Sequence, residues 1–420
     1  MKRDRIATNE EIELSLKSNS LDRNNYLNNL LQMLTTISEH TVLALDGNWG
    51  SGKTFFIKQL EYLSAKPANY TNINEDIIKE FNNLYSIFYF NAWENDNLPP
   101  LESILLQMSN EMWNTTEELS NRIIGLVKNI VNIPVKYFSG GSADLENFED
   151  TYISQYIERA KKISKLSDEI NNILHNYEEK TGKKVLFIID DLDRCKPTFA
   201  VELLETIKHN FNSSDAIFLI CANNKQLQHT IKKYYGNDFN GYEYLDRFYD
   251  LVINLPEPDI ENYIKYQMQL KNVDYGYNSV AIDIAKIEHM SLRQINRYIS
   301  SMELLEDFLG SNSLGSEARY DICTKNVFIQ IACALKLLDA KKFNDFTTGN
   351  GDYILDEYMK RSEEIKSFAD GEPPIKTCYK ELFNLHGSHY RNSDAFKKAV
   401  SSIGFSTIID TKPESTEVQH

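Results

Sequence analysis

Eight consecutive residues have the types and spacing of a loop that binds phosphate groups. They fit the pattern G-x-x-x-x-G-K-[ST] and read Gly47, Asn48, Trp49, Gly50, Ser51, Gly52, Lys53 and Thr54. Glycine lets the backbone curl so that successive N–H groups point at phosphate oxygens, and a following helix adds its N-terminal dipole. We expect Lys53 to contact the β- and γ-phosphates of a nucleotide such as ATP, and the Thr54 hydroxyl to bind Mg²⁺. The next residue, Phe55, has no assigned role.

A second group of polar residues follows the apolar run VLFIID, which ends at Asp190. A carboxylate at the end of a buried strand is the Mg²⁺ partner of a phosphate-binding loop, so Asp190 is expected to hold the metal. Asp191 is the first choice and Asp193 the second for polarising the attacking water. The alternative is a polar turn in which Asp193 caps the following helix. Arg194 is expected to pair with nearby acidic groups.

Short apolar runs alternate with helical patterns along the first 256 residues. The runs, interpreted as strands, are 41–47, 86–93, 185–190, 216–222 and 250–256. Helical patterns cover 21–40, the segment after the phosphate loop, and roughly 100–120 and 150–180. This alternation predicts an α/β fold with a mostly parallel sheet.

The rest of the chain is predicted from breaks in these patterns. The stretch 136–150 contains a serine and glycine break and is expected to be a loop or insertion. Beyond Pro256 the pattern is helical up to 347, and glycine and proline interrupt it over 348–376. The polar tail is expected to be disordered.

Three stretches together resemble the KAP family of P-loop NTPases, which are relatives of the AAA+ and STAND NTPases. They are GNWGSGKT (47–54), FYFNAWEND (88–96) and FIIDDLDRC (187–195). The resemblance implies a three-layer α/β/α fold with a parallel sheet of order 5-1-4-3-2 and a helical lid. We therefore expect a P-loop NTPase core over 1–256 with a helical insertion at about 98–180, a lid over 257–310, and a C-terminal helical region over 311–420.

The resemblance also implies roles for residues outside these stretches. Asn223 stands where a sensor orients the attacking water, although the family usually has an Asp about one residue further on. Arg247 is expected to act as a finger on the nucleotide of a neighbouring subunit, and Arg293 to reach the γ-phosphate from the lid. The alternative for both arginines is a surface or ion-pairing role. Trp49 and Trp93 could stack on adenine, but we favour structural packing for both.

Composition limits the possible partners. The net charge is -16 and the isoelectric point is about 5.1, so the overall field repels duplex nucleic acid and anionic membranes, and no strong nucleic-acid signature is present. The five cysteines are scattered without a CxxC pair, which indicates reduced cytosolic thiols and argues against a zinc site. The N-terminus lacks the apolar core of a secretion signal, and no apolar run is long enough to span a bilayer. We expect a cytoplasmic protein.

One weakly apolar stretch, Ile123 to Phe138, is an exception to this polar character. Lys128 and Lys136 stand there beside Ile and Val, which allows an interfacial helix in peripheral contact with the inner membrane. We favour the alternative, a helix that caps the domain or docks a partner.

These residues predict a Mg²⁺-dependent ATPase that acts as a nucleotide-controlled switch or assembly module. The resemblance further implies bacterial conflict systems, including phage defence, and we expect a homo-oligomer with a partner protein at the C-terminal region. The alternatives are a nucleotide-binding scaffold or sensor without significant turnover, and an ATPase subunit coupled to a nuclease or other effector. The nearest grouping for such a second activity is Glu381, His386 and His389. No Asn-Lys-x-Asp motif is present, so the choice between ATP and GTP stays open.

Overall fold

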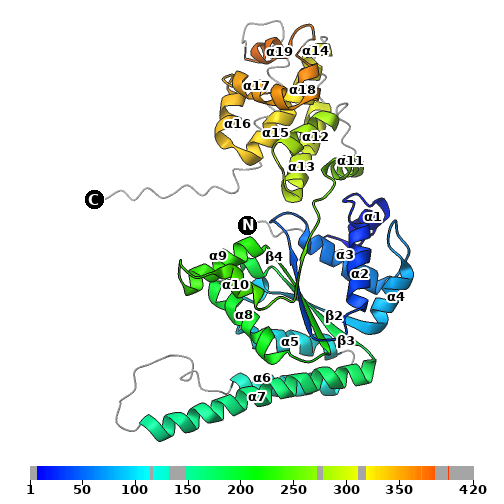
Figure 1. Cartoon of the computed structure of the whole chain (residues 1–420). Helices are drawn as coiled ribbons and strands as arrows, with labels where there is room; N and C mark the ends of the chain where they lie inside the picture. Colours follow the sequence, from blue (N-terminus) through cyan, green and yellow to red (C-terminus); the bar gives the residue numbers. More distant parts are fainter. Residues whose placement is uncertain are drawn as a thin grey trace.

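A five-stranded parallel sheet forms the centre of the molecule, with helices on both faces (Figure 1). A further group of helices lies beyond the carboxyl ends of the strands. The computed structural model describes residues 7–113, 117–131, 148–271, 278–310, 318–369, 371–383 and 396. The strands are β1 (Thr41–Asp46), β2 (Tyr85–Asn91), β3 (Lys184–Asp190), β4 (Ala216–Ala222) and β5 (Leu251–Asn254). Their order is β2-β3-β4-β1-β5. This is the predicted order 5-1-4-3-2 counted from the other edge, and it confirms the α/β fold class.

Two hydrophobic layers cover the sheet, because successive side chains of a strand point to opposite faces. In β3, Leu186 and Ile188 face one layer, whereas Phe187 and Ile189 face the other. The first layer contains α1 (Asn9–Ser18), α2 (Asn24–Thr35), α3 (Lys53–Ala65) and α4 (Glu75–Leu84). The second contains α5 (Pro100–Trp113), α6 (Glu117–Val131), α7 (Phe148–Thr181), α8 (Pro197–Asn210), α9 (Asn224–Tyr235) and α10 (Gly241–Asp246). The expected three-layer α/β/α arrangement is therefore confirmed.

The helices after β5 pack around a hydrophobic core of their own. They are α11 (Ile260–Leu270), α12 (Asn278–Ile287), α13 (Leu292–Gly310), α14 (Ala318–Cys323), the π-helix η4 (Thr324–Phe328), α15 (Ile329–Leu338), α16 (Ala340–Thr347), α17 (Asp352–Arg361), α18 (Glu363–Ser367) and α19 (Ile375–Glu381). Buried residues from Tyr263 to Phe396 belong to this core. The helices expected as a lid (257–310) and those expected as a C-terminal region (311–420) therefore share one core.

The helix expected over 21–40 is present as α2, and a further helix, α1, precedes it. The sequence patterns do not predict α1. Asn19 and Asp22 have positive φ angles of 49° and 53°, so the chain turns between the two helices. This turn brings Arg23, at the start of α2, close to the phosphate loop.

The stretch considered as a possible interfacial helix belongs in part to α6. Ile123, Leu126 and Val127 are buried in the second layer of the sheet, whereas Lys128 is exposed. Because these apolar side chains face the core, this part of α6 does not present them to a membrane. Residues 132–138, most of the predicted loop and the tail lie outside the described residues. Within the described part of the chain, no helix is long and apolar enough to cross a bilayer.

Candidate nucleotide-binding site

The phosphate loop lies between β1 and α3, at the carboxyl edge of the sheet. Gly47 N donates to the carbonyl of Ala222 at the end of β4, with an N–O distance of 3.3 Å. Gly50 and Gly52 have φ angles of 78° and 95°, in the left-handed region that favours glycine. Gly52 is the N-cap of α3, so this helix begins at Lys53 with its N-terminus at the loop. The sequence-predicted strand–loop–helix context is confirmed.

Polar groups inside the loop are available to an anion. Lys53 is buried, and its Nζ donates to the carbonyls of Gly47 at 2.6 Å and Asn48 at 3.4 Å. The Ser51 hydroxyl is also buried and has no hydrogen-bond partner. Because an unpaired buried hydroxyl is costly, a ligand that bonded to it would restore the lost hydrogen bond.

Asp190 ends β3 beside this loop, as the sequence predicts. Its carboxyl is fully buried and hydrogen-bonds to the side chain of Thr54. The Tyr89 hydroxyl donates to Oδ2 at 3.1 Å, and Asp191 N donates to Oδ1 at 2.9 Å. Burial raises the pKa of Asp190, and the hydrogen bonds and the charge of Lys53 oppose this only in part. A buried carboxyl next to a threonine hydroxyl is a donor set that fits Mg²⁺.

Asp191 occupies a strained turn directly after β3. Its φ is 59°, a left-handed value that Asp tolerates better than most residues. Its Oδ1 pairs with Arg194 Nε at 3.1 Å, which confirms the expected local pairing of that arginine. Burial, together with the charge of Asp190, raises the pKa of Asp191 to about 6 even though Arg194 lowers it.

The two tryptophans contact this acidic turn. Trp49 Nε1 donates to Asp193 Oδ2, which links the phosphate loop to the turn (3₁₀ helix η3, Leu192–Arg194). The Arg194 guanidinium lies 5.6 Å from the ring centroid of Trp93, in the 3₁₀ helix η1 (Trp93–Asn95). Both contacts agree with structural packing, although Trp49 is half exposed. Asp193 is buried and bonded to Trp49, so it is less accessible than Asp191.

The start of α13 is seated on the phosphate loop. A Cβ placed on Gly50 would lie 2.8 Å from Ser291 Oγ and 3.5 Å from Arg293 Cβ. A Cβ on Gly52 would lie 3.1 Å from Leu292 Cδ1. The structure therefore brings the backbone of the predicted lid arginine to the loop, and only glycine leaves room for this approach.

Arg23 is a component of the site that the sequence patterns missed. It is 2% exposed, and its guanidinium donates to the Ser51 carbonyl at 2.8 Å and to the Pro256 carbonyl at 2.9 Å through Nε. Burial lowers its pKa to about 10. It joins the phosphate loop to the segment that leads into the lid, across 233 residues of sequence. In the sequence, Arg23 stands at the start of a helical pattern, and nothing in that pattern indicates a contact with the phosphate loop.

The remaining predicted residues lie at two different edges of the sheet. Asn223, 6% exposed, follows β4 beside the phosphate loop, and its side chain caps α9 by accepting from Gln226 N at 3.1 Å. Arg247 is exposed and directly follows α10, in the segment that leads to β5. The neighbouring Asp250 bonds to Val42 at the start of β1, so Arg247 lies at the amino edge, a strand length away from its own phosphate loop.

The three C-terminal residues considered for a second activity are only partly described. Glu381 ends α19, whereas His386 and His389 lie outside the described residues.

A parallel sheet of this order defines a P-loop NTPase when its first strand leads through G-x-x-x-x-G-K-T into a helix and a buried Asp ends its third strand. Residues 23–314 match the model of the KAP family P-loop domain, and the chain belongs to this family. No curated protein matches the sequence closely enough to count as a relative. Membership of the family implies nucleotide binding and hydrolysis.

Proposed function

We propose that this chain binds Mg-ATP at the phosphate loop, hydrolyses it slowly to ADP and phosphate, and switches an assembly with its nucleotide state. The contact between the Thr54 hydroxyl and the buried Asp190 carboxyl carries the proposal. The two groups come from the ends of different elements and meet beside a lysine that is otherwise bonded only to loop carbonyls.

Each group at the loop has a task that its position supports. Thr54 and Asp190 would hold Mg²⁺, which supplies positive charge against the phosphate oxygens. Lys53, released from the Gly47 carbonyl, would donate to the same oxygens. The N-termini of α3 and α13 both lie at the loop, so two helix dipoles favour an anion there.

Asp191 is the group we propose to polarise the attacking water. Its raised pKa of about 6 lies near neutral pH, where a general base is most effective. Its ion pair with Arg194 must open before it can act, and this requirement suits slow turnover. Asn223 lies at the same edge, where its amide could help to orient the water.

The lid contact supports a switch. A nucleotide that enters between the loop and α13 changes the contact of Gly50 with Ser291 and Arg293. The nucleotide moves the lid only if it binds more tightly to one position of the lid than to the other. Because the lid shares its core with the C-terminal helices, these would move together and could present or hide a surface for a partner protein. Arg247, too far from its own loop, would serve the site of a second copy in a homo-oligomer. The family resemblance suggests bacterial conflict or phage defence as the setting.

Release of phosphate from ATP tests this function. We expect slow turnover by the wild type and a fall of about 100-fold or more for Asp191→Asn, with ATP binding retained. Asp193→Asn is the matched control and should lose less. Tight ATP binding without any phosphate release by the wild type would favour the scaffold alternative. Parallel assays with GTP determine the preferred base.

A further inference from the structure

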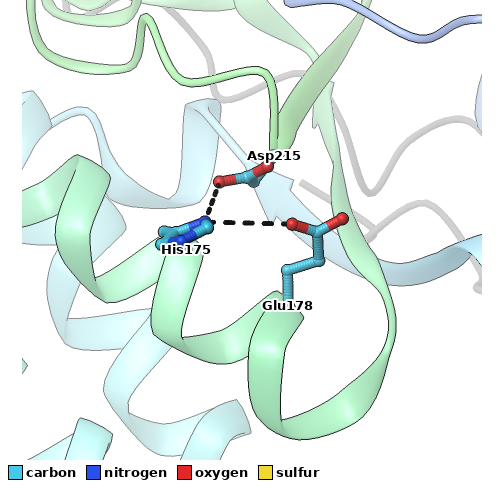
Figure 2. A group of neighbouring side chains, drawn as sticks. All are labelled: His175, Glu178 and Asp215. Atoms are coloured by element: carbon cyan, nitrogen blue, oxygen red, sulfur yellow. Dashed lines mark ion pairs between the residues drawn. The ribbon is translucent and has the colours of Figure 1, made fainter.

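A second group of titratable side chains lies at the amino edge of the sheet, opposite the phosphate loop. His175 and Glu178 stand one turn apart near the end of α7, and Asp215 directly precedes β4. Figure 2 shows the three side chains pointing toward one another from these separate elements. The proposed nucleotide chemistry uses none of them.

The surrounding backbone holds this group in place. The spacing of three residues puts His175 and Glu178 on one face of α7. Asp215 is fixed to the sheet, because its carbonyl accepts from Val185 N at 2.8 Å. Its side chain is 8% exposed and accepts from the hydroxyls of Ser213 at 2.9 Å and Ser214 at 3.3 Å. Hydroxyls that orient a carboxylate in this way are typical of the groups behind a metal ligand.

The distances suit a small cation. His175 Nδ1 lies 3.4 Å from Asp215 Oδ2 and 3.9 Å from Glu178 Oε2, and one ligand atom from each residue falls within 4.8 Å of the others. Around a tetrahedral ion with bonds of about 2.0–2.1 Å, ligand atoms are roughly 3.3 Å apart. The His–Asp edge already has this length, and the His–Glu edge exceeds it by about 0.6 Å. Glu178 is one-third exposed, so its side chain has room to adjust.

The charges also favour a cation. Glu178 and Asp215 place two carboxyl groups beside one imidazole, with one ligand atom of each within 4.8 Å of the others, so negative charge gathers where a cation would bind. Lys184 acts on this pair from β3, yet its ammonium donates to the Ser38 carbonyl at 2.7 Å.

We propose that His175, Glu178 and Asp215 form a binding site for a divalent transition-metal ion, with Zn²⁺ the best fit. An imidazole nitrogen selects zinc, cobalt or nickel over magnesium and calcium, which prefer oxygen alone. Three protein ligands leave a position for water on the exposed side. The scattered cysteines argued against zinc, but this site uses no cysteine, and all five cysteines are buried.

The ion would fasten α7 to the sheet. α7 has 34 residues, about 51 Å, and extends well past the sheet in Figure 1. Its contact with Asp215 lies near the end that enters β3. A metal at this point would fix the direction of the long helix relative to the NTPase core.

Titration of the metal-free full chain with Zn²⁺ and Co²⁺, without nucleotide, tests the proposal. The wild type should bind about one ion per chain, and Co²⁺ should give the visible spectrum of a nitrogen and oxygen site without a thiolate charge-transfer band. His175→Gln and Asp215→Asn should each weaken binding by about 100-fold or more, as expected when a ligand itself is removed. Glu169→Gln is the matched control and should bind as the wild type does, because Glu169 is an exposed carboxylate on the same helix, about 9 Å away along α7.

A second readout guards against misfolded variants. Zn²⁺ should raise the unfolding midpoint of the wild type and leave that of His175→Gln unchanged, since an ion that binds only the native state stabilises it. The His175 side chain is 59% exposed, so this variant should fold even if Asp215→Asn does not. No binding by the wild type, a thiolate spectrum, or equal affinity in His175→Gln would each overturn the proposal.

Discussion

Replacing Asp191 with Asn should stabilise the nucleotide-free protein at neutral pH. The pKa of this carboxyl rises from 3.8 to about 6 on folding, a little over two units, which corresponds to about 3 kcal/mol. The native state therefore keeps a proton between about pH 4 and 6 that the unfolded state releases, and stability falls as pH rises through this window. Asn resembles the protonated side chain, so the variant avoids this loss. The favourable pair of the ionised carboxylate with Arg194 is already included in the pKa of about 6.

The assay is urea unfolding of both proteins from pH 4 to pH 8, without metal or nucleotide. The difference in unfolding free energy should be close to zero at pH 4 and should grow to about 3 kcal/mol in favour of Asp191→Asn at pH 8. Asp238→Asn, in an exposed turn, is the control and should show no such growth. A difference that does not change with pH, or a variant less stable than the wild type at pH 8, would refute the reasoning.

Three further changes test other parts of the site. Gly50→Ala should lower the free energy of unfolding by about 1–2 kcal/mol because of its positive φ, and should weaken ATP binding by displacing the lid. Gly125→Ala is the control and should be neutral or stabilising, because Gly125 has open space around it in α6. Thermal unfolding measures the stability of both variants, and calorimetry measures their ATP binding. Arg23→Met should destabilise by about 2 kcal/mol, because it leaves the partly buried carbonyls of Ser51 and Pro256 without their donor. Normal stability in urea would show that water replaces the guanidinium. Arg247→Ala and Lys53→Ala should each be inactive alone. If Arg247 acts on a neighbouring copy, mixing the two variants should restore part of the phosphate release, because an intact Arg247 then lies beside an intact phosphate loop. No recovery in a proven oligomer would exclude Arg247 as an arginine finger.

The sequence predicted the sheet because its strands are nearly continuous apolar runs. All seven residues of β4 are buried, and a strand of this kind is recognisable without any partner. The phosphate loop and Asp190 could likewise be placed together, because loops after parallel strands meet at one edge of the sheet.

The contacts that complete the site were not predictable, because they join distant parts of the chain. Arg23 meets Pro256 across 233 residues, and Trp49 meets Asp193 across 144. No local sequence pattern predicts either contact. An arginine before a helix usually faces solvent, and an aromatic residue in a glycine-rich loop usually packs locally. His175 and Asp215 also come together only because α7 ends beside the start of β4.

Helix boundaries were least certain where polar residues dominate. α1 is short and carries many acidic or amide side chains, so its apolar face gave a weak signal. α4 has a clear apolar face, with Ile78 and Phe81 buried, but it was not predicted from the sequence. The predicted division between the lid and the C-terminal region at 310/311 falls within a continuous core, because burial of apolar surface unites the helices on both sides of it.

The central claim is that the phosphate loop and Asp190 form one site for metal and nucleotide. Calorimetric titration of ATP with and without Mg²⁺ tests it in three proteins: the wild type, Asp190→Asn and Lys53→Ala. We expect Mg²⁺ to strengthen ATP binding to the wild type by roughly tenfold or more, because one contact between charged groups contributes about 1.5 kcal/mol or more to the binding free energy. Asp190→Asn should bind ATP but lose this Mg²⁺ effect, and Lys53→Ala should bind neither form. An equal Mg²⁺ effect in Asp190→Asn, or wild-type affinity in Lys53→Ala, would contradict the account.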